Sequence, residues 1–238
     1  MAKYCIYILF FAFYHSIAFS QYKIIYLLHG QGSDERIFSE LVFPDEFSVI
    51  PLRYDTISRF YSMKGLAQKL TKNIDKNNEI TLIGVSLGGM LAVEMSKIIP
   101  CKHTIIVSSA KTKYDLPLRY TFQKIVPIYK IIPPILIKKS SNLAQKIVEK
   151  DRKTKKLLFN QMLSDKKASF YKYSIPMIIF WRNKIVPPNV IHIHGTKDHT
   201  LPMRKIKKID ITIQNGSHMM ILTRSNELNK HILSIINQ

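Results

Sequence analysis

The sequence predicts an α/β fold, a doubly wound and mostly parallel sheet with an inserted helical segment. One observation is that short apolar runs alternate with stretches of helical periodicity, which favours a parallel sheet covered by helices on both faces. The other is that residues 111–188 interrupt this alternation with seven prolines, no glycine and many lysines. At 238 residues the chain has the length of one such domain with an insertion.

The first half of the chain supplies most of the alternating elements. The expected strands are residues 22–30, 47–52, 79–85 and 103–110, and the expected helices are residues 63–74 and 87–99. Pro100 ends the second of these helices, because proline lacks the N–H that a helix interior needs. The stretch EITLIGV at 79–85 is apolar at nearly every position, so we expect that strand to be central in the sheet.

The pattern resumes after residue 188. Two further strands are expected at 189–198 and 207–218, followed by a C-terminal helix with apolar residues at Leu222, Leu228, Ile232 and Ile235. The predicted core domain therefore combines residues 21–110 and 189–238.

The intervening residues 111–188 predict a basic helical cap. They hold 18 Lys and Arg against four acidic residues, so +14 of the formal net charge of +20 lies here. Apolar residues recur among the lysines as amphipathic helices require. They are Phe122, Ile125, Tyr129, Ile132, Leu136, Leu157, Leu158, Met162 and Phe170.

The N-terminal residues 1–20 have the pattern of a secretory signal peptide. Lys3 precedes an apolar run, and Ala18-Phe19-Ser20 is a small-x-small cleavage signal. The run is shorter than the roughly 20 residues of a spanning helix, so we expect cleavage after Ser20 and export to a periplasm or the outside. An uncleaved anchor and a core segment are the alternatives.

Cysteine and metal-ligand patterns predict neither a disulfide nor a metal or other cofactor. Cys5 would leave with the signal peptide, and Cys101 alone has no partner within the chain. Cys101 precedes an apolar strand, which favours a small buried residue over a nucleophile. No CxxC or HExxH spacing occurs.

One serine lies where the central strand is expected to become a helix. Gly84 and Gly88 flank Ser86 two residues away on each side, in Gly-Val-Ser-Leu-Gly. A nucleophile on such a tight strand-to-helix turn needs small neighbours, and the Leu87 N–H at the helix start would face a developing oxyanion. The alternative is a structural turn serine.

With this motif the chain resembles the α/β-hydrolase superfamily, across everything except the signal peptide and the cap. The resemblance implies a chain order of serine, acid and histidine, which Ser86, Asp198 and His218 follow. It also implies that His218 is the general base and that Asp198 accepts its Nδ1–H. Asp198 could instead be a turn or N-cap residue, and Asp115 in the cap is the main rival for the acid.

The remaining histidines are weaker candidates. His192 alternates with isoleucines and reads as a strand residue, and His194 and His199 lie close to Asp198 in sequence. His199 is a loop residue with potential substrate contact, and His103 opens a strand. We interpret His29, at the end of the first strand, as a structural or pocket residue because the triad already supplies a base.

The resemblance places the second oxyanion donor on the backbone N–H of Gln31, after His29 and Gly30. Gly30 and Gly32 would let the backbone approach closely at this loop. The sequence departs here from the HGGG pattern of one esterase group, which puts membership of that group in doubt.

These residues predict a serine hydrolase that cleaves a carboxylic ester, a thioester or an amide through an acyl-enzyme on Ser86. The alternatives are a non-catalytic binding protein with this fold and a lipid-surface acyl hydrolase. We expect a monomer that acts on a small acyl substrate and binds no nucleic acid, because the charge belongs to no nucleic-acid module. The cap lysines favour a solvated face over an anionic-membrane patch. The lysines considered are Lys138, Lys139, Lys153, Lys155 and Lys156.

Overall fold

The computed structural model describes residues 21–148 and 154–238. The predicted signal peptide, residues 1–20, lies outside the described residues, and so do residues 149–153 of the predicted cap, which include Lys153. No helix in the described ranges is long and apolar enough to cross a membrane.

A six-stranded parallel sheet forms the centre of the molecule, with strand order β2-β1-β3-β4-β5-β6. The strands are β1 (Lys23–Leu28), β2 (Phe47–Pro51), β3 (Glu79–Val85), β4 (His103–Val107), β5 (Val190–Gly195) and β6 (Ile211–Ile213). The predicted parallel α/β class is confirmed, and the apolar strand β3 is central, between β1 and β4.

Every strand except β3 is shorter than the sequence predicted, and left-handed backbone explains where two of them end. β4 stops at Val107 because Ser108 has φ of 47°, which a strand cannot contain. The predicted strand at 207–218 reduces to β6. It ends before a turn at Asn215, which has φ of 58° and whose N–H donates to Thr196 Oγ1 at 2.8 Å.

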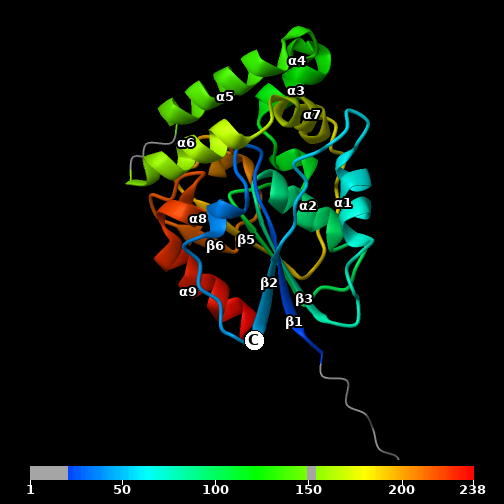
Figure 1. Cartoon of the computed structure of the whole chain (residues 1–238), viewed down its shortest axis with the longest axis vertical. Coiled ribbons are helices and arrows are strands. Elements are labelled where there is room, and N and C mark those ends of the chain that lie inside the picture. The colour runs from blue at the N-terminus through cyan, green and yellow to red at the C-terminus, as the bar shows by residue number, and fades with distance from the viewer. Residues whose placement is uncertain (1–20, 149–153) are drawn as a thin grey trace, which may run out of the picture.

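Helices cover both faces of the sheet (Figure 1). α1 (Met63–Thr71) and α2 (Leu87–Met95) pack on one face, and α8 (Met220–Thr223) and α9 (Ser225–Ile236) pack on the other. Alternate strand residues serve the two sides, since Leu28 joins the core under α2 while Leu27 joins the core under α9. Every residue of α2 is buried, so this helix lies inside the molecule.

Five further helices lie beyond the carboxyl ends of the strands (Figure 1). They are α3 (Leu118–Ile125), α4 (Ile128–Ile131), α5 (Pro134–Val148), α6 (Lys156–Asp165) and α7 (Ala168–Ile179). Prolines mark the first three starts, with Pro117 and Pro127 as N-caps and Pro134 as the first residue of α5, where the missing N–H costs nothing. Short one-turn helices η1 (Glu35–Phe38), η2 (Lys113–Asp115) and η4 (Met203–Lys205) complete the chain.

The last helix of this group belongs to the main core. Phe170 and Ile178 of α7, and Trp181 beyond its end, pack in the same cluster as α2. The Trp181 indole N–H also donates to Glu94 Oε1 in α2 at 2.7 Å. α7 is therefore fixed to the sheet domain, and α3, α4 and α5 pack on α7 from outside.

Several apolar residues of the predicted cap do not face the interior. Phe122, Ile125, Leu136 and Leu157 are between 51% and 78% exposed, although amphipathic helices normally bury their apolar side. Tyr129, Met162 and Phe170 are buried as that pattern requires.

Candidate active site

Ser86 occupies a strained turn between β3 and α2. Its φ of 53° and ψ of −117° are rare for a residue with a side chain. A Cβ on Gly84 would lie 2.4 Å from the Gly88 carbonyl oxygen, and a Cβ on Gly88 would lie 2.0 Å from that of Leu28. Both glycines are therefore required by packing, as the sequence motif predicted.

The prediction that Gly30 and Gly32 allow a close approach of the backbone holds for only one of them. A Cβ on Gly30 would meet only ordinary contacts, the nearest at 3.4 Å, so the expected close approach is absent there. Gly32 does lie close to another element, because a Cβ would be 2.5 Å from Gln145 Nε2 of α5. The sequence reasoning also missed Gly89, where a Cβ would lie 2.4 Å from Ser109 Oγ. The second glycine of the Gly-Gly pair was the available signal.

The structure brings Ser86, His218 and Asp198 together in one hydrogen-bonded chain. His218 Nε2 lies 2.9 Å from Ser86 Oγ, and His218 Nδ1 lies 2.7 Å from Asp198 Oδ2. The other oxygen of Asp198 accepts the Leu201 N–H at 2.7 Å. Asp198 and His218 are buried and Ser86 is half-buried, so the hydroxyl is the open end of the chain.

The rival residues lie elsewhere. Asp115 is buried, but its carboxylate accepts the backbone N–H groups of Lys111 and Thr112 and forms a capping box at η2. His199 is exposed, and the cavity beside Ser86 is lined by its neighbours Thr200 and Leu201 instead. His103 opens β4, as predicted.

Two buried histidines of β5 extend the chain behind Asp198. His194 Nε2 lies 2.9 Å from the Leu201 carbonyl oxygen and 3.4 Å from Asp198 Oδ2. Both neighbours are acceptors, so His194 carries its proton on Nε2. His192 Nε2 lies 3.0 Å from His194 Nδ1 and therefore donates to it. Burial lowers the pKa of both histidines, which keeps them neutral, and His194 then donates its Nε2–H to the Leu201 carbonyl oxygen.

His29 is a buried structural residue. Its ring stacks on Tyr54 at 4.2 Å, and its Nδ1 lies 2.8 Å from the Gly30 carbonyl oxygen. Burial, with a contribution from the Lys166 cation, lowers the pKa of His29 to about 4. The imidazole is therefore neutral near pH 7, which agrees with the structural reading from the sequence.

Two backbone donors flank Ser86 without a protein partner. In residues 21–148 and 154–238, neither the Gln31 nor the Leu87 N–H donates a hydrogen bond to the protein. The Leu87 N–H is at the N-terminus of α2, where the helix dipole favours negative charge. The Gln31 side chain is held from α7, since its Nε2 donates to Ser174 Oγ at 2.6 Å and lies 3.3 Å from the Tyr171 carbonyl oxygen.

A cavity of about 80 Å³ lies beside Ser86. Its walls come from the Ser86 turn, the Gln31 loop, the His218 loop and the helices above the sheet. The helices contribute Tyr120 of α3, Gln145 of α5 and Ile178 of α7. A group that occupies this cavity would therefore lie beside these side chains.

No metal site or reactive thiol stands out in the part of the chain that the structure describes. No group of three or more His, Cys, Asp and Glu residues there is arranged to hold a metal ion. Burial raises the pKa of the Cys101 thiol to about 12, so this half-buried cysteine stays protonated and is a poor nucleophile.

Solved structures match this chain closely in shape at low sequence identity. MenH from S. aureus matches with a TM-score of 0.70 and 18% identity, over 91% of this chain and 94% of that one. A thermophilic esterase from Thermogutta terrifontis gives 0.66 and 13%, over 91% and 90%. The enol-lactonase from Burkholderia xenovorans LB400 gives 0.63 and 11%, over 91% and 92%. No family model and no curated protein matches the sequence.

Proposed function

We propose that this chain, which has the α/β-hydrolase fold, is a serine hydrolase that cleaves a carboxylic ester through an acyl-enzyme on Ser86. The observation that carries the proposal is the hydrogen-bonded chain from Ser86 Oγ through His218 to Asp198, at 2.9 Å and 2.7 Å. The strained φ of Ser86 supports it, because such strain is kept where a hydroxyl must point out of a tight turn.

The first half of the reaction forms the acyl-enzyme. Ser86 Oγ attacks the carbonyl carbon while its proton passes to His218 Nε2, and Asp198 stabilises the resulting imidazolium. The carbonyl oxygen becomes an oxyanion, for which the free N–H groups of Gln31 and Leu87 are the donors. The ester C–O bond then breaks, and His218 returns the proton to the leaving alcohol oxygen.

The second half releases the acid. Water gives a proton to His218 Nε2 and attacks the acyl carbon, the Ser86–acyl bond breaks, and the proton returns to Ser86 Oγ. A thioester or an amide would pass through the same steps. The small cavity beside Ser86, about 80 Å³, favours short acyl groups, and we propose that the helices α3 to α7 select them as a cap.

The test is labelling of the full chain by a fluorophosphonate probe, followed by mass spectrometry of the modified peptide. We expect one label for each chain, on Ser86, and none in Ser86→Ala. The exposed residue Ser58 provides the matched control, since Ser58→Ala should label like the wild type. A panel of p-nitrophenyl esters from acetyl to decanoyl, with thioesters and peptides beside it, then identifies the leaving group and the acyl length.

Absence of labelling on folded wild-type protein would contradict the proposal and favour a binding protein that keeps this fold. Ser86→Ala turnover above a few percent of the wild type would contradict the nucleophile assignment, because loss of a triad serine costs orders of magnitude in kcat.

A further inference from the structure

An unusual number of large apolar side chains is exposed on the helices α3, α4 and α5. We call this surface the outer face. Its members are between 41% and 82% exposed, and all lie within residues 118–136. They are Leu118, Phe122, Ile125, Val126, Ile128, Ile131, Ile135 and Leu136. Exposed apolar clusters of this kind mark interaction surfaces more often than accidents of packing.

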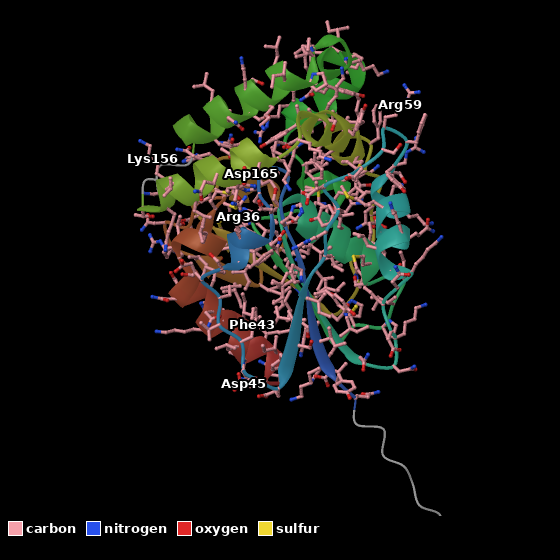
Figure 2. All side chains as sticks on the ribbon, in the orientation of Figure 1. Arg36, Phe43, Asp45, Arg59, Lys156 and Asp165 are labelled. Atoms are coloured by element: carbon pink, nitrogen blue, oxygen red, sulfur yellow. The ribbon has the colours of Figure 1, made fainter. Side chains whose placement is uncertain are left out.

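The opposite sides of α4 and α5 are already buried, while α3 has no buried residue. Tyr129 of α4 and Ile137 of α5 pack with Tyr171 and Ile179 of α7 in a separate apolar cluster. The outer face is therefore a second apolar side on helices whose first side already packs on α7. Side chains project freely into solvent from the outer side of α5 at the top of the molecule (Figure 2).

Positive charge accompanies the outer face without any negative charge. Residues 116–148 contain six Lys and Arg and no Asp or Glu. Lys124, Lys130 and Lys139 are exposed, and none forms an ion pair with a carboxylate of the described residues.

Other cap lysines are engaged within the protein. Lys138 donates to the carbonyl oxygens of Ser164 and Lys166, and Lys155 pairs with Glu40 at 2.9 Å. The neighbouring ion pair of Arg36 with Asp165, at 2.7 Å, likewise joins η1 to α6 (Figure 2). Lys124, Lys130 and Lys139, by contrast, are not engaged in this way.

We propose that the outer face binds the surface of an anionic lipid bilayer. Its aliphatic side chains would enter the boundary between headgroups and acyl chains, while Lys124, Lys130 and Lys139 lie on the anionic headgroups. The proposal does not depend on the chemistry of Ser86. It does concern the same helices, because Tyr120 of α3 and Gln145 of α5 line the Ser86 cavity.

Two other occupants fit the outer face less well. A second copy of the chain, joined by a two-fold axis, would bring this acid-free surface against itself and set lysines against lysines. A single-stranded nucleic acid would need aromatic side chains for base stacking. Only Phe122 among the eight apolar members supplies one.

The first experiment compares apolar variants of the full chain in vesicle flotation. The vesicles are pure phosphatidylcholine, or phosphatidylcholine with phosphatidylglycerol at about a third of the lipid. The test variant is Ile125→Ser with Ile131→Ser, at 78% and 82% exposure. The matched control is Val42→Ser with Ile185→Ser, at 70% and 71%. All variants keep residues 1–20, so any vesicle binding by that segment is the same in each of them.

We expect the wild type and the control to bind anionic vesicles equally, and the test variant to bind at least tenfold more weakly, since each lost aliphatic side chain removes buried apolar area. Ser86→Ala should bind like the wild type, which separates docking from the proposed catalysis.

The second experiment removes the charges. Lys124→Gln, Lys130→Gln and Lys139→Gln together should weaken binding on the order of a hundredfold, about fivefold for each lysine near an anionic surface. The exposed residues Lys72, Lys76 and Lys230 lie away from the outer face, and their change to Gln is the matched control. That control should bind like the wild type at physiological salt.

Three results would overturn the proposal. The first is equal binding of the wild type and the apolar variant to anionic vesicles. The second is equal binding of the wild type to neutral and anionic vesicles. The third is a dimer in sedimentation that Ile125→Ser with Ile131→Ser dissociates, which would assign the outer face to a second copy.

Discussion

The turn around Ser86 and the outer face of α3 to α5 both lie toward the carboxyl ends of the strands, but their side chains are packed very differently. At the turn, the positions of Gly84 and Gly88 leave no room for one additional carbon atom. On the outer face, residues such as Ile125 and Ile131 extend into solvent with nothing packed against them. Packing therefore restricts which residues fit at the turn, but it does not restrict them on the outer face.

The difference explains what each region can do. A nucleophile needs its hydroxyl, base and oxyanion donors held within fractions of an ångström, which the crowded turn provides. An adaptable surface needs side chains that are not yet committed to a neighbour. Between the two regions, the Gln31 loop approaches Gln145 of α5 and bonds to Ser174 of α7.

The largest effect is expected at Asp198, the acid of the proposed triad. Asp198→Asn should lower kcat on a p-nitrophenyl ester by about 10⁴-fold, because an amide in this place favours the wrong His218 tautomer. Asp115→Asn is the matched control, since Asp115 accepts backbone N–H groups at η2. It should lower the free energy of unfolding by about 1–2 kcal/mol and leave kcat nearly unchanged. The opposite pattern in the two variants would show that Asp198 is not the acid.

The next effect tests the packing of the turn itself. Gly88→Ala should lower the free energy of unfolding by about 3 kcal/mol or more, because the new Cβ would lie 2.0 Å from the Leu28 carbonyl oxygen. Gly30→Ala should cost less than about 1 kcal/mol, since its nearest contacts would be at 3.4 Å. Urea denaturation measures both variants. Equal losses at the two positions would remove the contrast between a crowded turn and an ordinary loop.

Much of the core and the arrangement of the proposed triad could be predicted from the sequence for the same physical reason. A tight turn demands glycines at fixed distances from Ser86, and a central strand demands a continuous apolar run, so both leave local signals. The strand ends at Ser108 and Asn215 were missed, because a positive φ at a non-glycine residue depends on its surroundings.

The helical region could be predicted only in outline. The repeat of Phe122 and Ile125 on one helical face indicates amphipathic helices, but periodicity does not say whether that face meets the protein or its surroundings. The burial of Tyr129 against α7 depends on long-range packing, and so does the contact of the His192–His194 pair with Asp198. Only tertiary structure brings these groups together.

The free energy of unfolding should decrease at acidic pH, because buried histidines of the core resist protonation. Burial, with the Lys166 cation, lowers the pKa of His29 to about 4, and burial also lowers the pKa of His192 and His194. Because unfolded histidine titrates near pH 6.5, the unfolded chain binds more protons between about pH 6.5 and pH 4. The free energy of unfolding should therefore be constant above about pH 7. It should fall as pH drops below 6.5, by up to about 1.4 kcal/mol per pH unit for each histidine.

Residues 111–188 contain no histidine, so the histidine contribution to this pH dependence comes from the rest of the chain. Urea denaturation at intervals from pH 7.5 to pH 4.5 measures it, and His29→Gln should make the acid slope shallower by the contribution of one histidine. An unchanged slope in that variant would mean that His29 takes up a proton equally well in the folded protein.

The smallest expected effect lies between the two regions, at the contact of the Gln31 loop with α7. Ser174→Ala removes the acceptor that holds Gln31 Nε2 at 2.6 Å and leaves the Tyr171 carbonyl oxygen at 3.3 Å. The loop that carries the proposed oxyanion donor should then be less well positioned. The loss of one such hydrogen bond is worth about 1 kcal/mol, so kcat should fall about fivefold with KM unchanged.

Ser140→Ala in α5 is the matched control for this last change. Ser140 Oγ also bonds to a helix carbonyl, that of Ile137 at 2.9 Å, but it is exposed and makes no contact with the Gln31 loop. Steady-state kinetics on one short ester should therefore separate Ser174→Ala from both Ser140→Ala and the wild type. If KM rises in Ser174→Ala while kcat stays constant, α7 contacts the substrate rather than the loop. If neither constant changes, the turn keeps its geometry without the helices, and the two regions act independently.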